Sequence, residues 1–213
     1  MKVVGDRRAS RWDAHRRNRR AELTDAAIAA IRTHGAGVGM DDVAAQARTS
    51  KTAVYRHFAD RTELYVAVCA RVAEVLAAQV RAAMDRAAGP YAKTAAAIAA
   101  YLRLIEHDPE VYRFVVHRPL VDRALDADPV ADLVSLIGDE AAAVITEQLA
   151  RIGADTTAAV PWGHGVVGMV RAAADNWLAR PEGMTRDQLA THLTDLAWAG
   201  LSGVVVREKE PTT

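Results

Sequence analysis

Apolar residues recur at intervals of three and four along most of the chain, which is the period of amphipathic helices. A short instance covers residues 40–47, where one face is formed by Met40, Val43, Ala44 and Ala47. The triplet Arg48-Thr49-Ser50 breaks this pattern, and Ser50 is a suitable N-cap for a second short helix over residues 51–58. The spacing leaves room only for a tight turn between the two helices.

The second of these helices is unusually polar for its length. Val54 and Phe58, one helical turn apart, are able to anchor it to a core. The remaining positions carry cations, hydroxyls and an imidazole, namely Lys51, Thr52, Tyr55, Arg56 and His57. Asp60 and Glu63 then form the pattern of a capping box that opens a third helix. Two helices joined by such a turn, the second rich in polar groups, fit a DNA major groove.

The rest of the chain is also predicted to be helical. The predicted helices cover residues 18–34, 60–87, 91–107, 109–117, 129–152, 155–179 with a kink near Pro161, and 185–205. Thr185 with Gln188 forms a further capping box at the start of the last one. No strand-like alternation stands out, and the alanine-rich composition favours helix. We therefore predict an all-α protein.

The segment from about residue 18 to residue 70 resembles the DNA-binding domain of the TetR/AcrR family of one-component transcriptional repressors. The family pattern is matched by Gly35, Met40-x-x-Val43-Ala44, Ser50-Lys51, Tyr55-x-x-Phe58, Arg61 and Glu63-Leu64. Two positions depart from it, because Arg48 and Gly39 stand where the family usually has Gly and Thr. Since glycine tolerates positive φ, Arg48 is expected either to be modestly strained or to take ordinary geometry.

The resemblance implies an N-terminal three-helix helix-turn-helix DNA-binding domain and a larger C-terminal α-helical domain for ligand binding and dimerisation. We place a basic flexible arm at residues 1–17, the DNA-binding domain at 18–65 and the C-terminal domain at 66–208. The predicted DNA-binding residues are Arg48, Thr49, Ser50, Lys51, Thr52, Tyr55, Arg56, His57 and Arg61. These residues define a predicted interface with double-stranded operator DNA.

The predicted DNA contacts divide into two kinds. The resemblance suggests that Tyr55 and Arg61 contact phosphates. Exposure at the start of the recognition helix suggests that Lys51 or Arg56 reaches the bases.

Charge is unevenly distributed along the chain, although its net value is zero. Residues 1–62 carry 13 Lys and Arg against 7 Asp and Glu, whereas residues 63–213 carry 14 against 20. Eight of the cations lie in residues 1–20, and such a basic segment is expected to be disordered. It can follow DNA phosphates or enter a minor groove, or it can simply aid solubility. We favour contact with DNA.

The cysteine content and the hydropathy of the chain indicate the cellular compartment in which the protein is expected. The single cysteine, Cys69, excludes an internal disulfide and fits a reducing cytoplasm. No signal peptide is recognisable, and the best apolar stretch, residues 95–102, is far shorter than the ~20 residues that cross a bilayer. We expect a soluble cytoplasmic protein that has no membrane partner.

A mainly apolar small molecule, such as an acyl chain or a lipophilic drug, is the expected effector. Its candidate site combines large apolar side chains with a few polar ones, on helices that the resemblance would arrange around a cavity. The candidates are Tyr101, Leu102, Ile105, Tyr112, Val116, His117, Leu133, Ile137, Trp162, Val166, Met169, Arg171, Asn176 and Trp177. Any single one of the apolar residues is more simply interpreted as ordinary core, and it is the set, with its Tyr and Trp polar atoms, that favours a ligand site.

The last two predicted helices carry more apolar surface than packing within one monomer requires. The residues concerned are Val170, Leu189, Leu193, Leu196, Trp198, Gly200 and Leu201. One interpretation is intrachain core; the other, which the resemblance also implies, is a four-helix homodimer interface. A homodimer would present two recognition helices to a palindromic operator.

Other chemistry has little support in the sequence. Residues 163–168 satisfy G-x-G-x-x-G, but a dinucleotide site needs a preceding strand, so we predict no cofactor. The seven histidines show no metal-ligand spacing and none pairs with a plausible nucleophile. The sequence thus predicts a ligand-responsive transcriptional repressor. An all-α enzyme without a recognisable catalytic motif and a DNA-binding protein without a ligand are the alternatives.

Overall fold

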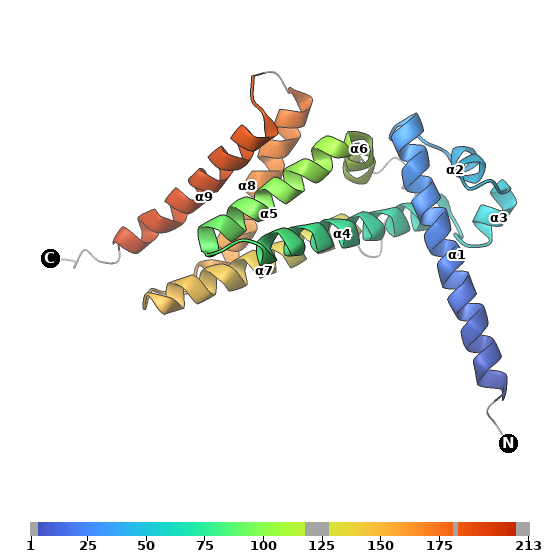
Figure 1. The fold of residues 1–213 in the computed structure, drawn as a ribbon, viewed down its shortest axis with the longest axis horizontal. Helices are drawn as coiled ribbons and strands as arrows, with labels where there is room; N and C mark the ends of the chain where they lie inside the picture. The colour runs from blue at the N-terminus through green and yellow to red at the C-terminus, as the bar shows by residue number, and fades with distance from the viewer. Residues whose placement is uncertain (1–3, 118–127, 181–182, 208–213) are drawn as a thin grey trace. The chain divides into compact units, whose positions relative to one another are not determined.

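The computed structural model describes residues 4–117, 128–180 and 183–207, and within these ranges it contains helices and turns but no strand. The all-α prediction is therefore confirmed. Figure 1 shows the helices, which are α1 (Val4–His34), α2 (Met40–Gln46), α3 (Lys51–Tyr55), α4 (Arg61–Asp85), α5 (Pro90–His107), α6 (Pro109–His117), α7 (Pro129–Arg151), α8 (Ala159–Ala179) and α9 (Arg186–Arg207). None of the helices in the described ranges combines the length and apolarity needed to cross a bilayer.

Most predicted helix ends agree with the structure, but the end of α3 and the start of α8 differ from the prediction. α3 ends at Tyr55, although the Phe58 amide still donates to the Val54 carbonyl at 3.1 Å, so one further turn of backbone follows it. α8 begins at Ala159 and not near residue 155. Pro161 therefore lies in the first turn of α8, where its missing N–H costs no helical hydrogen bond.

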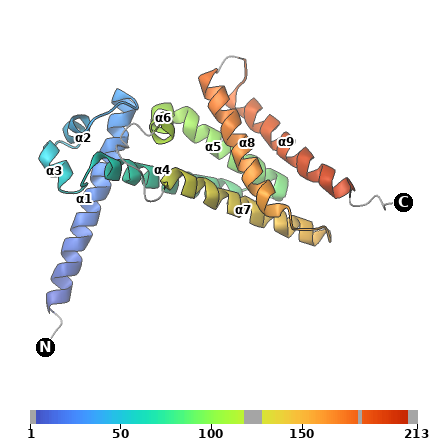
Figure 2. The same ribbon diagram turned by 180° about the vertical axis from the view of Figure 1, so that it is seen from behind.

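The largest difference from the prediction lies at the N-terminus. α1 begins at Val4, so residues 4–17 are helical, whereas we expected a disordered arm. Arginine and alanine are strong helix formers, and a helix that is already nucleated in the core extends at little cost. The first turns of α1 extend beyond the other helices of their own compact unit in both views (Figures 1 and 2).

The chain forms two compact units. The first contains α1, α2, α3, α4 as far as Val72, and α6. The second contains α4 from Ala73 onward, with α5, α7, α8 and α9. α4 is thus one continuous helix that contributes to both.

The first unit has a fully buried core, to which α6 is tied by polar contacts. The core side chains include Leu23, Ala27, Ile31, Val38, Val43, Val54, Phe58, Leu64, Tyr65, Val68 and Phe114. Arg32 of α1 makes a bidentate ion pair, at 2.7 and 2.8 Å, with Asp108, the residue directly before α6. The Tyr65 hydroxyl donates to the Val115 carbonyl at 2.8 Å. These contacts place α6 in the first unit, although α5 and α7 belong to the second.

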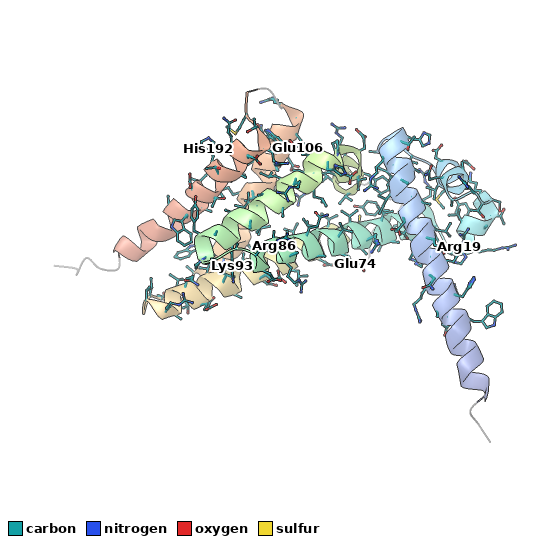
Figure 3. The ribbon with its side chains drawn as sticks, viewed as in Figure 1. Arg19, Glu74, Arg86, Lys93, Glu106 and His192 are labelled. Atoms are coloured by element: carbon teal, nitrogen blue, oxygen red, sulfur yellow. The ribbon has the colours of Figure 1, made fainter. Side chains whose placement is uncertain are left out.

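In the second unit, α5 and α9 pack side by side with their ends joined by polar contacts. Arg186, at the start of α9, pairs with Glu106 at 2.9 Å, and Glu106 is labelled on α5 in Figure 3. Toward the other end of α5, the Tyr91 hydroxyl donates to Asp195 at 2.6 Å. The two helices therefore run antiparallel. The predicted Thr185–Gln188 capping box is confirmed, since the two residues exchange backbone and side-chain hydrogen bonds.

The glycines of the G-x-G-x-x-G segment lie inside α8, where one of them serves packing. A Cβ added to Gly163 would stand 2.5 Å from the amide nitrogen of Ala142 on α7, so only glycine permits this approach. Next to it, His164 lies over Gly138 and its Nε2 is 3.0 Å from an Asp139 carboxylate oxygen. The segment has the geometry of a helix crossing and not of a phosphate-binding loop.

Candidate functional site

α2 and α3 are joined by a four-residue turn whose geometry is set by hydrogen bonds at the end of α2. The Thr49 amide donates to the Ala44 carbonyl at 2.9 Å, and the Arg48 amide donates to the Ala45 carbonyl at 3.0 Å. This pair of bonds is a Schellman motif, whose penultimate residue takes left-handed geometry. Arg48 accordingly has φ of +51°. Of the two geometries that the sequence left open, the strained one is present.

α3 is capped and anchored as its sequence predicted. The Ser50 hydroxyl accepts a hydrogen bond from the Ala53 amide at 3.2 Å, which satisfies a free donor of the first turn. Val54 and Phe58 are completely buried. Since these two side chains hold one side of the helix, the other side is left for a ligand.

The predicted DNA-binding residues fall into an exposed group and a partly buried group. Arg48, Ser50, Lys51, Thr52, Tyr55 and Arg56 are exposed, and Thr49, His57 and Arg61 are partly buried. They belong to the turn before α3, to α3 with its C-cap residue Arg56, to the segment between α3 and α4, or to the start of α4. They therefore lie close together along the chain around the recognition helix.

Lys51 has an acidic partner that the sequence analysis missed. Its ammonium lies 2.8 Å from a carboxylate oxygen of Asp41 on α2. The hydrogen bond to Asp41 and the charge of that carboxylate raise the pKa of Lys51. Ten residues separate the pair, so helical spacing gives no signal of it. Lys51 thus has an intramolecular partner that a DNA contact would have to displace, whereas Arg56 makes no ion pair in the described structure.

Cations of α1 surround the end of the recognition segment. The pKa of His57 is lowered, first by burial and then by the neighbouring charges of Arg16, Arg19, Arg20 and His15. Arg19 is labelled on α1 in Figure 3. The basic segment of α1 and the end of the recognition segment therefore lie along one edge of the first unit, where Arg19 also pairs with Glu22 at 2.7 Å.

Arg20 has a structural role within this edge. Its guanidinium donates to the His57 carbonyl at 2.5 Å, lies 2.7 Å from a Glu63 carboxylate oxygen and stacks 4.3 Å from the centre of the Phe58 ring. Glu63 also accepts from the Ala59 amide at 2.5 Å, and its own amide donates to Asp60 at 2.7 Å. One half of the capping box predicted for α4 is thus present, the bond from the Glu63 amide to Asp60, whereas the Glu63 carboxylate accepts from Ala59 in place of Asp60 and pairs with Arg20 of α1.

Two buried nitrogens at this edge have no hydrogen-bond partner. They are Nδ1 of His57 and Nε of Arg61. Buried polar groups are nearly always satisfied in folded proteins, so unpaired ones commonly mark places where a ligand or water completes the bonding. Arg61 stands at the first position of α4, where we predicted a phosphate contact.

The predicted effector-binding residues have mixed environments. Leu102 and Ile105 are completely buried, and the indole N–H of the buried Trp177 donates to the Met184 carbonyl at 2.9 Å. Asn176 is exposed. The partly buried candidates of the second unit are Tyr101, Leu133, Ile137, Trp162, Val166, Met169 and Arg171. Tyr112 and Val116 are partly buried in the first unit, and the His117 side chain lies outside the described residues.

The residues predicted for the dimer interface include both buried and exposed side chains. Val170, Leu189 and Leu193 are buried within the single chain. Leu196 is 59% exposed, and Gly200 is exposed as well. Trp198 is 38% exposed and meets the Tyr91 ring edge-to-face at 5.5 Å, while the side chain of Leu201 lies outside the described residues.

Comparison with known proteins agrees with this architecture. Residues 23–68 match the family of bacterial regulatory proteins, tetR family, and residues 79–213 match the tetracyclin repressor-like C-terminal domain. The uncharacterized HTH-type transcriptional regulator Rv0472c of Mycobacterium tuberculosis H37Rv is 34% identical over 204 residues, which cover 95% of this chain and 86% of that protein. The HTH-type transcriptional activator FasR of Mycolicibacterium smegmatis is 29% identical over 202 residues, covering 94% and 90%.

A solved structure shares the fold at lower identity. FadR from Bacillus subtilis in complex with stearoyl-CoA superposes with a TM-score of 0.69 at 15% identity, over 84% of this chain and 98% of that one. With the helix-turn-helix geometry and both domain matches in agreement, the chain belongs to the TetR family of bacterial transcriptional regulators.

Proposed function

We propose that the protein is a ligand-responsive transcriptional repressor, which binds a palindromic operator as a homodimer and is released by a mainly apolar small molecule. The observation that carries the proposal is the polarity of α3. Val54 and Phe58 hold one side in the core, and the other side exposes Lys51, Thr52, Tyr55 and Arg56. A short helix with this surface, preceded by a tight turn, is the form that enters a major groove.

The DNA contacts are assigned by position and chemistry. Lys51 and Arg56, exposed on α3, are the candidates for base edges. Tyr55, which is exposed, and Arg61, which is partly buried at the start of α4, are the candidates for phosphates.

Dimerisation is assigned to the outer faces of α8 and α9. Leu196 on α9 is exposed, and on α8 the exposed positions Gly165, Gly168 and Ala172 would let another helix approach closely. Two helices from each subunit would form a four-helix interface. In a dimer, the two recognition helices lie roughly 34–36 Å apart, which is one turn of DNA.

The dimer assignment is tested by two matched substitutions. Leu196→Arg should give monomers in sedimentation, because it places a charge in the proposed interface. Leu136→Arg on α7 changes an equally apolar residue that is 55% exposed and should leave a dimer. A dimer that persists in Leu196→Arg would move the interface elsewhere.

The effector is assigned to the half-buried apolar residues of the second unit, chiefly Trp162, Val166 and Met169 of α8 and Leu133 and Ile137 of α7. These are large side chains that packing leaves incompletely covered, which suits a ligand of hydrocarbon character. FadR was crystallised with stearoyl-CoA, so stearoyl-CoA and free stearate are the first probes.

Release requires only a modest coupling between the effector and DNA sites. α4 is one helix that contributes to both units, so a change at its C-terminal half can alter the DNA-reading half. A coupling of roughly 1–3 kcal/mol would change operator affinity by about 5–150-fold.

The test begins with selection of genomic fragments that the purified protein binds. The selected operator is then used in a release assay with stearoyl-CoA, shorter acyl-CoAs, stearate and lipophilic drugs. An active compound is repeated on Trp162→Ala and Met169→Ala, with Val160→Ala, an exposed position of the same helix, as the control. Equal release in all variants would show that the compound binds elsewhere, and failure to select any fragment would refute DNA binding itself.

Activation is the second candidate mode, because the relative FasR is named an activator. A reporter gene behind the selected operator separates the two modes. Repression predicts higher expression when the regulator is deleted, whereas activation predicts lower expression.

A further inference from the structure

The first turns of α1 present an exposed tryptophan in a strongly basic setting. The helix is continuous from Val4 to His34, and from Trp12 onward its first buried residue is Leu23. Trp12 lies more than two turns earlier and is 76% exposed, which makes it the most exposed large apolar side chain of the described structure. Its backbone is held in a regular helix, and the described residues leave most of its side chain uncovered.

Cations accompany Trp12 along the same helix. Arg16, Arg17 and His15 are exposed, and Asp13 is the one acidic residue between Trp12 and Arg20. The charges of His15, Arg16 and Arg19 reach His57, which closes the recognition segment. The basic turns of α1 are therefore electrostatically continuous with the proposed DNA-reading surface.

We propose that the N-terminal turns of α1 are a rigid helical arm that docks on the DNA flanking each half-site, with Trp12 packed against the sugar–phosphate backbone and the surrounding cations on phosphates. The inference rests on the proposed DNA binding and extends it to base pairs outside the reach of α3. Phosphate contacts fix a protein's position on the duplex and carry no sequence information, so the arm lengthens the footprint without changing the sequence that is read.

The chemistry of the arm selects duplex DNA over two other partners. A helix that lies on a membrane needs an apolar stripe, and Trp12 is the one large apolar residue among residues 5–22. Contact with the arm of another subunit would bring like charges together. Polyanionic DNA complements both the charge and the isolated aromatic ring.

The length of the arm sets the size of the flank. Trp12 precedes Arg20 by eight residues, which is about 12 Å along a helix axis. At about 3.4 Å for each base pair, this distance corresponds to roughly three or four base pairs beyond the site where Arg20 braces the recognition segment. The arm should accordingly protect DNA just outside the minimal palindrome.

The test compares two DNA fragments that carry the same selected operator. One is trimmed to the minimal palindrome, and the other keeps ten additional base pairs on each side. Trp12→Ala removes the ring but no charge. Ala14→Pro breaks the helix but keeps Trp12 and every cation, and Ala14→Ser is its matched control.

Both disruptive variants should lose about tenfold in affinity for the long fragment, the size of one good contact, and bind the trimmed fragment like wild type. Ala14→Ser should bind the long fragment like wild type. Thermal midpoints should be unchanged in all three, because residue 14 precedes the buried core of α1. Since Trp12 is the only tryptophan of the first unit, its fluorescence should respond to the long fragment, and the response should vanish in Trp12→Phe.

The possible failures are distinguishable. Wild-type affinity for the long fragment in Ala14→Pro would overturn the rigid arm and leave a flexible basic tail. Unchanged binding of both fragments by Trp12→Ala would overturn the role of the ring. Binding to phosphatidylglycerol vesicles that Trp12→Ala abolishes, without any flank effect, would assign the arm to a membrane surface. If wild type binds neither fragment, the proposed function fails together with the inference.

Discussion

The two compact units differ in how completely their aromatic and other large core side chains are buried, Trp12 lying outside the core of the first unit. In the first, Phe58, Tyr65 and Phe114 are completely buried, and the rings of Tyr65 and Phe114 pack at 5.7 Å. In the second, Trp162 and Met169 remain partly exposed. A unit that reads DNA needs one fixed surface, which dense packing provides. The proposed ligand response would need apolar surface in the second unit that its own chain does not fill.

The largest expected effect tests this difference directly. Phe58→Ala should destabilise the first unit by about 3–5 kcal/mol, since it leaves a cavity in a dense core and removes the ring under Arg20. Trp162→Ala should cost only about 1–2 kcal/mol, because the indole is already partly solvated. Urea unfolding followed by circular dichroism measures both. Equal losses would mean that the second unit is packed as densely as the first.

The next effect separates the two cations of α3. Arg56→Ala should weaken operator binding by about 1–3 kcal/mol. Lys51→Ala should cost less, because Asp41 already neutralises the ammonium, and Asp41→Ala should tighten binding. Fluorescence anisotropy with the selected operator measures these affinities, with Arg103→Ala, an exposed cation of α5, as the control. A larger loss for Lys51→Ala would show that the lysine leaves Asp41 to read DNA.

A smaller effect should show opposite signs for stability and binding. Arg48→Gly should stabilise the first unit by about 0.5–1 kcal/mol, because glycine takes a φ of +51° without strain, although it gains entropy when unfolded. Operator affinity should fall, since a cation beside the groove is lost. Arg48→Ala removes the same charge without relieving the strain, so it should weaken DNA binding without stabilising the fold. Equal thermal midpoints for the Gly and Ala variants would contradict the strain argument.

The smallest effect concerns pH. Burial and the nearby arginines lower the pKa of His57 in the folded protein, so the unfolded chain binds more protons at this residue. Its contribution to stability is therefore present above about pH 6.5, the ordinary histidine pKa, and is lost as the pH falls toward the folded value. The urea midpoint should change less between pH 7.5 and pH 5.5 in His57→Gln than in wild type. The control is His192→Gln, which alters an exposed histidine of α9 and should leave the wild-type change in midpoint as it is.

The local sequence determined the helix-turn-helix, because its signals act over one or two helical turns. Ser50 caps α3 through Ala53, and Glu63 accepts from Ala59 at the start of α4, each through a neighbour a few residues away. The same is true of the Thr185–Gln188 box. The spacing of Val54 and Phe58 by four residues likewise marks the side that is buried. Such patterns are satisfied within a short stretch of chain, so sequence spacing is enough to identify them.

The tertiary structure decided which partners distant residues meet. Helical periodicity marked Leu189, Leu193 and Leu196 alike as apolar, and only the packing of α9 against α5 buried the first two and left Leu196 outside. Likewise, the short spacing within 163–168 could not show that Gly163 faces Ala142.

The membership of α6 was decided in the same way. Arg32 and Asp108 are 76 residues apart, and Tyr65 and Val115 are 50 apart. Periodicity states which side of a helix is apolar but carries no information about which other helix covers it. That choice depends on the summed packing and polar contacts of the folded chain, which exist only once its distant segments are brought together.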